Sequence, residues 1–186
     1  MKNIYLILLL VIPLFSISQN VEFDKDFFTP EQYSDLKEAK RNIKDGDDYF
    51  FRDLPGYQPA LEYYLKAYDF NPNNAALNYK IGKCYLESVQ KVKSIPFLES
   101  AYALNPKIGE TKNYPSDVQY LLARAYHLNY EFEKAIATFK SFMSGLSPAH
   151  LSEVQADIQQ AIKQCNTAME MVEQPVRVFI DNIGAP

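Results

Sequence analysis

The sequence contains no tryptophan, two cysteines, two histidines and only six glycines among its 186 residues. So few glycines argue against phosphate-binding loops and against folds built from many strands and tight turns. The net charge of −4, without any cluster of lysine and arginine, argues against a nucleic-acid partner. The histidines and cysteines also lack the short spacings of a structural zinc site, so no metal is expected.

Aromatic and apolar residues are plentiful instead. The chain has 14 tyrosines and 12 phenylalanines, and hydrophobic residues make up 47% of it. A chain of this composition can bury a core, and its length suits one domain or one short repeat array. We therefore expect a helical, mildly acidic protein.

The N-terminus has the pattern of a secretory signal peptide over residues 1–18. Lys2 precedes an apolar run from Ile4 to Phe15, and Ser16-Ile17-Ser18 supplies small residues for cleavage. The run is too short to span a membrane, so no transmembrane segment is expected. No cysteine follows it, which argues against a lipoprotein anchor. Export to the periplasm, with possible outer-membrane association, is the prediction, and a buried N-terminal helix is the alternative.

Export makes the two cysteines, Cys84 and Cys165, candidates for a disulfide. Cys84, however, lies in an expected helix among small and aromatic residues, where a free thiol behaves as a small hydrophobe. Two buried thiols are favoured over a bridge.

The middle of the chain repeats itself. Ala67-Tyr68 and Asn71-Pro72 recur 34 residues later as Ala101-Tyr102 and Asn105-Pro106. Three sets of residues share one pattern: a small residue lies three places before a tyrosine, and a second small residue and then a bulky one follow. The three sets are Gly46, Tyr49, Ala60 and Tyr64; Gly82, Tyr85, Ser94 and Leu98; Ala123, Tyr126, Ala135 and Phe139.

These sets predict pairs of helices. A small residue on the first helix lets the second approach closely, and the bulky residue fills the angle between them. Such pairs stack into a solenoid, because one pair alone cannot bury both of its faces. Capping patterns predict helix starts at Thr29-Pro30, Ser116 and Ser147-Pro148.

The pattern resembles the tetratricopeptide repeat (TPR), with three copies over residues 38–146. It departs from the family in lacking the common tryptophan and in an insertion of about seven residues near 108–114. The resemblance implies an all-α helix-turn-helix solenoid, preceded by an extension over residues 19–37. The alternative is an irregular helical bundle. Residues 147–174 are predicted to form a capping helix, with apolar positions at Leu151, Val154, Ile158, Ala161, Ile162, Cys165, Ala168 and Met169.

Residues 175–186 change character. Val176 to Ile180 reads as a strand, and Asn182-Ile183-Gly184-Ala185-Pro186 follows. This phrase resembles the propeller start of exported Bacteroidota proteins that join a TPR region, a WD-repeat-like propeller and an OmpA-family domain. The resemblance implies a chain that continues beyond Pro186, with peptidoglycan as a partner only through such a missing domain. It also implies an association with type IX secretion, by fold-level analogy.

No catalytic pattern is present. The serines and threonines lack a nucleophile elbow, and no nucleophile has a base beside it in the sequence. Asp45, Asp47, Asp48 and Asp53 surround Gly46 without the spacing of a calcium loop, and a solvated surface is the favoured interpretation. We therefore expect neither enzymatic activity nor a cofactor.

The function class that remains is binding of a partner through the shape of the surface. In TPR arrays the first helix of each pair lines the concave face, and helical projection places one set of residues there: Ile43, Asp47, Phe50, Phe51, Tyr79, Lys83, Leu86, Glu87, Tyr120, Arg124, His127 and Leu128. Phe50 and Leu128 could equally be core between repeats. The carboxylate clamp of co-chaperone TPR arrays would fall on Ile43, Asp47, Lys80, Asp117 and Leu121, of which one is basic, so that role is disfavoured.

The leading hypothesis is a non-catalytic scaffold of the bacterial cell envelope that docks a partner protein. The first alternative is a structural module that self-associates or packs on its own downstream domains. A weaker third hypothesis is an accessory that recruits an envelope enzyme.

Overall fold

The computed structural model describes residues 19–112 and 115–174, and within these ranges the chain is all-α. The predicted signal peptide (1–18) and the predicted strand (176–180) lie outside the described residues. The α-helices are α1 (Tyr33–Phe50), α2 (Tyr57–Phe70), α3 (Ala75–Leu86), α4 (Ser94–Leu104), α5 (Val118–Leu128), α6 (Phe132–Ser144) and α7 (Pro148–Glu173). Among the described residues no helix has the length and hydropathy of a membrane span.

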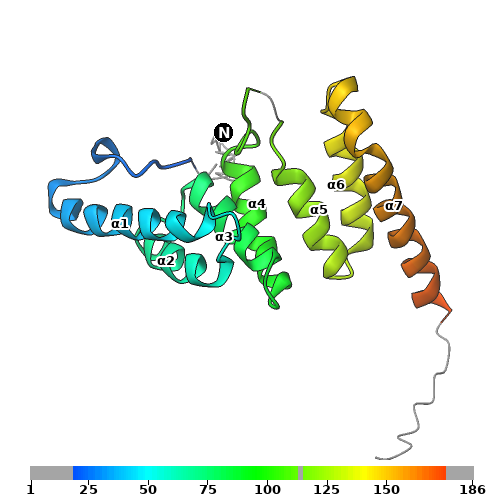
Figure 1. Ribbon diagram of the computed structural model, residues 1–186, viewed down its shortest axis with the longest axis horizontal. Coiled ribbons are helices and arrows are strands. Elements are labelled where there is room, and N and C mark those ends of the chain that lie inside the picture. The colour runs from blue at the N-terminus through cyan, green and yellow to red at the C-terminus, as the bar shows by residue number, and fades with distance from the viewer. Residues whose placement is uncertain (1–18, 113–114, 175–186) are drawn as a thin grey trace, which may run out of the picture.

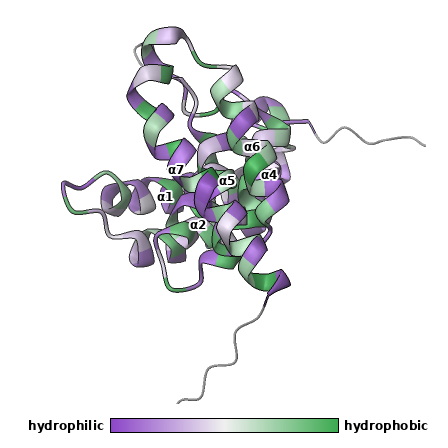
Figure 2. Cartoon of the chain, turned by 90° about the vertical axis from the view of Figure 1, so that its right-hand side faces the viewer, coloured by the Kyte–Doolittle hydropathy of each residue, from purple (hydrophilic) through white to green (hydrophobic). Residues whose placement is uncertain are grey.

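The first six helices form three pairs. The most extensive contacts join α1 to α2, α3 to α4 and α5 to α6, and weaker contacts join each pair to the next. Figure 1 shows the pairs following one another along the long axis of the molecule, with α7 at the far end. Figure 2 shows hydrophobic and hydrophilic residues alternating along the helices. The sequence prediction of successive helix pairs is confirmed for the described residues.

Close approach within each pair depends on the small residues identified in the sequence. A Cβ atom built on Gly46 would lie 2.5 Å from Cε1 of Tyr64, and one on Gly82 would lie 2.6 Å from Cγ of Leu98. In the third pair Ala123 and Phe139 occupy the corresponding places, and both are buried. The ring or side chain of the second helix therefore occupies the space that a larger residue on the first helix would need.

Asparagines organise the turn between the first two pairs. The Asn74 side chain accepts a hydrogen bond from the Leu77 N–H and so caps α3. The N-terminal segment binds this same turn: the N–H of Val21 donates to the Asn73 carbonyl at 2.8 Å, and the Asn20 side chain accepts from the N–H of Ala75 at 2.8 Å. The extension before the first pair is thus held on the second pair.

The last helix, α7, packs against the third pair. Ile158 and Cys165 of α7 are fully buried. The other expected apolar positions of α7 except Leu151 also pack against that core, namely Val154, Ala161, Ile162, Ala168 and Met169. Ser147 caps α7, as expected, by accepting a hydrogen bond from the backbone N–H of His150.

One predicted helix start is misplaced. Ser116 was expected to begin a helix, but α5 begins at Val118 with Asp117 as its N-cap. The Ser116 hydroxyl accepts a long hydrogen bond from the Val118 N–H at 3.5 Å and donates to the carbonyl of Ile108 at 2.5 Å, which ties the long connection after α4 to the start of α5. The capping pattern alone could not predict the Ser116–Ile108 hydrogen bond, because this bond joins residues on opposite sides of the insertion.

Buried apolar residues in the described part form two clusters. One gathers α1, α2 and most of α3, from Ala39 to Tyr85, and the other runs from Leu86 in α3 to Cys165 in α7. Cys84 lies in the first and Cys165 in the second, and both are free, buried thiols. The preference for two buried thiols over a bridge is therefore confirmed.

Replacing Gly46 by alanine should destabilise the fold by about 1–3 kcal/mol, because the added methyl group would clash with the Tyr64 ring, which is fully buried. Urea unfolding followed by circular dichroism measures this change. Gly145→Ala is the matched control: its Cβ would lie 3.6 Å from the nearest atom, so the midpoint should hardly change. Equal midpoints for Gly46→Ala and the wild type would contradict the close-approach argument.

Candidate functional site

The first helices of the three pairs share one face, which we call the α1/α3/α5 face. Asp47 of α1 pairs with Lys80 of α3 at 2.6 Å, so long side chains of the two helices meet on this face. Glu87, directly after α3, pairs with Arg124 of α5 at 3.4 Å. The residues projected onto a common groove from the sequence thus come from neighbouring helices.

A hydrogen-bonded group fixes the α1 end of this face. One oxygen of Asp47 accepts from the Tyr64 hydroxyl and from the Lys80 ammonium, each at 2.6 Å. Burial, and then the hydrogen bond to the Asp47 carboxylate, raise the pKa of Tyr64 far above its ordinary value of 10.0. Tyr64 therefore stays a neutral donor. The sequence interpretation placed Asp47 on a solvated surface. In the structure its carboxylate binds Tyr64 and Lys80 instead.

Lys83 lies at the centre of the face. Its Nζ atom is 5.8 Å from the centre of the Phe50 ring and 6.0 Å from that of Tyr79. The Tyr79 hydroxyl donates to Asp117 at 2.7 Å, and burial is the main cause that raises the pKa of Tyr79. Aromatic rings attract a cation without neutralising its charge.

The α5 end carries Tyr120, Arg124 and His127. The Arg124 guanidinium lies 6.0 Å from the Tyr120 ring centre. His127 is half-buried, with its ring 6.0 Å from that of Phe132 in an edge-on arrangement. Tyr120 adds an aromatic surface to the face, and Arg124 adds a paired cation. His127 instead packs against the helix behind the face.

The prediction that Phe50 and Leu86 lie on the surface of the groove is wrong. Phe50 is only 7% exposed and Leu86 is fully buried, so neither offers contact area to a partner. Leu86 belongs to the cluster shared with the third pair, and Phe50 packs edge-on against Tyr57 and Tyr64. Phe51, by contrast, is 70% exposed. A helical projection shows on which side of a helix a residue lies. It does not show which residues at the end of that helix are covered by neighbouring helices.

A pocket of about 390 Å³ opens beside the α5 end of the face. It is lined by Tyr79, Gly109, Pro115, Asp117, Tyr120, Phe142, Leu146, His150, Glu153 and Val154. Only Tyr79 and Tyr120 were among the predicted groove residues. The α7 residues were missed because that helix was interpreted as a cap alone, although the spacing of His150 and Val154 puts both on one side of it.

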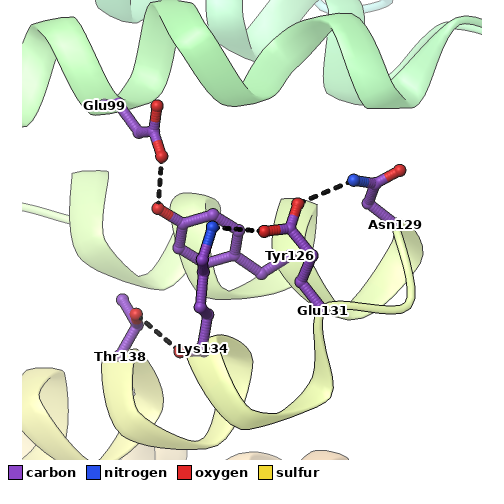
Figure 3. Close-up of polar contacts among 6 residues, drawn as sticks. All are labelled: Glu99, Tyr126, Asn129, Glu131, Lys134 and Thr138. Carbon is purple, nitrogen blue, oxygen red and sulfur yellow. Dashed lines mark hydrogen bonds and ion pairs between the residues drawn. The ribbon is translucent and has the colours of Figure 1, made fainter.

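A second polar cluster lies at the turn between α5 and α6 (Figure 3). The Tyr126 hydroxyl donates to Glu99 of α4 at 2.6 Å, and Lys134 and Asn129 both bind the Glu131 carboxylate. Burial and the Glu99 hydrogen bond raise the pKa of Tyr126, so its hydroxyl stays protonated. The cluster joins the second pair to the third.

One hydroxyl does lie beside a base, contrary to the sequence expectation. The Ser147 Oγ atom is 3.2 Å from Nδ1 of His150. The same oxygen accepts from the backbone N–H of His150, as an N-cap residue does. This second bond gives the hydroxyl a structural role at the start of α7.

The described residues contain no group of three or more histidine, cysteine, aspartate or glutamate side chains placed to hold a metal ion. The face presents aromatic surface and a few charges, while the Tyr64 and Tyr79 hydroxyls already donate to Asp47 and Asp117. No protein-family model and no curated protein sequence matches this chain.

The fold should lose stability in alkaline solution. Burial raises the pKa of the Cys84 thiol to about 12 from 9.0, and the pKa values of Tyr64, Tyr79 and Tyr126 also lie above their ordinary 10.0. Above about pH 9 the unfolded chain releases these protons while the folded chain keeps them, so stability falls as pH rises.

Urea midpoints measured from about pH 7 to about pH 10.5 should be constant at first and fall beyond pH 9. Tyr64→Phe, which removes one raised group, should reduce the slope of the fall. A midpoint that stays level across the whole range would show that these groups titrate equally in both states.

Proposed function

We propose that this protein is a non-catalytic scaffold that docks a partner protein on the α1/α3/α5 face. The observation that carries the proposal is that Tyr79 and Lys83 of α3 and Tyr120 and Arg124 of α5 come from the first helices of two successive pairs, while the exposed Phe51 ring lies by Lys80 of the same face. Aromatic anchors with a few orienting charges are what peptide-binding surfaces present. The Lys80 ammonium, the one basic group at the clamp positions, is already paired with Asp47, which argues against capture of a terminal carboxylate there.

The scaffold would be a TPR solenoid of three repeats over residues 38–146, capped by the helix over 147–174. The three successive pairs, the Gly46–Tyr64 and Gly82–Leu98 contacts at matching places, and the covering position of α7 support this assignment. By the same proposal the protein belongs to the group of Bacteroidota envelope proteins that its sequence resembles, in an outer-membrane or secretion-associated complex.

Location in the envelope can be tested by immunoblotting of fractionated native cells with an antibody against residues 30–172. A band several times larger than 21.4 kDa in the outer-membrane and peptidoglycan fraction would agree with a wall-anchored complex. A free periplasmic band slightly below 21.4 kDa would contradict wall anchoring but not export. A cytoplasmic band would contradict both.

Charge reversal tests the docking face itself. We expect Lys83→Glu combined with Arg124→Glu to reduce recovery of partner proteins at least tenfold in affinity capture, because both charges lie on the proposed surface. Loss of the exposed Arg124–Glu87 pair should change stability by less than about 1 kcal/mol, so the helical spectrum should be retained.

The matched control is Lys66→Glu combined with Lys163→Glu, which reverses two exposed lysines on α2 and α7. It should leave recovery unchanged. If the face variant recovers every partner that the wild type recovers, the docking proposal is wrong.

One observation favours the structural alternative, in which the array self-associates or packs on its own downstream domains. Large apolar side chains are exposed in or beside the turns within the pairs: Phe51, Leu54, Val89, Val92, Leu128 and Tyr130. In Figure 1 the α3–α4 and α5–α6 turns lie along the same lower edge. Exposed apolar patches commonly mark contact surfaces. Under this alternative, sedimentation rather than partner capture would respond to changes at the turns.

A further inference from the structure

Lys83 is an unneutralised cation in a partly buried place. In residues 19–112 and 115–174 it has no ion-pair partner, whereas its neighbours on either side, Lys80 and Arg124, are paired with Asp47 and Glu87. The Phe50 and Tyr79 rings flank its ammonium group without offsetting the charge. A half-buried cation of this kind gains most from a carboxylate that arrives with a ligand.

An apolar pocket adjoins this cation, and the Tyr79 ring belongs to both. Tyr120, Phe142, Leu146 and Val154, together with Pro115, supply further apolar lining. Its volume of about 390 Å³ leaves room for a bulky side chain.

The charges around the pocket fix the orientation of the ligand. Asp117 and Glu153 both line it, so a carboxylate placed there would be repelled. The acidic group of a ligand therefore belongs at Lys83, and the apolar group belongs in the pocket. The two places share Tyr79, so the two groups come from neighbouring residues of the ligand.

We propose that the ligand is a peptide segment in which an acidic residue is followed or preceded directly by a bulky apolar one, with the carboxylate on Lys83 and the apolar side chain in the Tyr79/Tyr120/Phe142 pocket. This inference rests on the proposed docking function and adds the chemistry of the partner. Both groups are needed, since the cation supplies orientation and the pocket supplies buried area.

The test uses fluorescence anisotropy with the full chain and a labelled hexapeptide, Ser-Gly-Glu-Phe-Gly-Ser. Replacing its Glu by Gln should weaken binding about tenfold, and Lys should weaken it further. Replacing Phe by Ala should also weaken binding about tenfold, while added salt should reduce the preference for Glu. These changes are made in the ligand, so folding of the protein does not confound them.

Two protein variants complete the test. Lys83→Glu should reverse the preference, so that the Lys peptide binds better than the Glu peptide, and Lys83→Gln should abolish the preference. Lys66→Glu is the matched control, because Lys66 also lies near a tyrosine ring, 5.3 Å from the centre of Tyr63, but on α2. It should bind as the wild type does.

Equal binding of the Glu and Gln peptides to the wild type would overturn the inference, and so would failure of all the peptides to bind at about 1 mM. Neither result would touch the docking function if the double charge reversal still abolishes partner recovery from cells. The peptide test can therefore contradict the acidic–apolar ligand while the partner-recovery test still supports the docking function.

Discussion

The close approach of the two helices in each pair is the contact on which the rest of the structure depends. Gly46 against Tyr64 and Gly82 against Leu98 leave no space for an additional Cβ atom, and Ala123 against Phe139 repeats the arrangement in the third pair. Tight pairs put α2, α4 and α6 behind α1, α3 and α5. Side chains of successive first helices then meet on one face, as do Asp47 and Lys80, which are more than thirty residues apart and form an ion pair.

That geometry also explains how the candidate site is assembled. Each first helix contributes a few side chains, and the neighbouring helix supplies their partners: Tyr79 of α3 binds Asp117 before α5, and Glu87 after α3 binds Arg124 of α5. The site is therefore a property of the stacking and not of any one pair. The α7 helix closes one end, so the pocket beside Tyr120 has a wall on the side where a further pair would otherwise stack.

Periodicity was enough to predict the helix pairs, the small residues between them and a helix within residues 147–174. These features depend on local spacing, which a sequence records directly. Burial of Leu86 was not predicted, because Leu86 packs into the cluster that the third pair completes, whereas burial of Phe50 was one of two open interpretations and results from its packing on Tyr57 and Tyr64. The Asp47–Lys80 pair and the α7 wall of the pocket were missed for the same reason: both join residues that only stacking brings together.

The division of the buried residues into two clusters has a consequence for the order of folding. The first cluster is complete once residue 97 is available, because its members run from Ala39 to Tyr85 and Phe97 packs against them from α4. A chain made from its N-terminus onward can therefore bury this cluster before α5, α6 and α7 exist. The second cluster then grows on Leu86, so α3 serves as a finished template for the later helices.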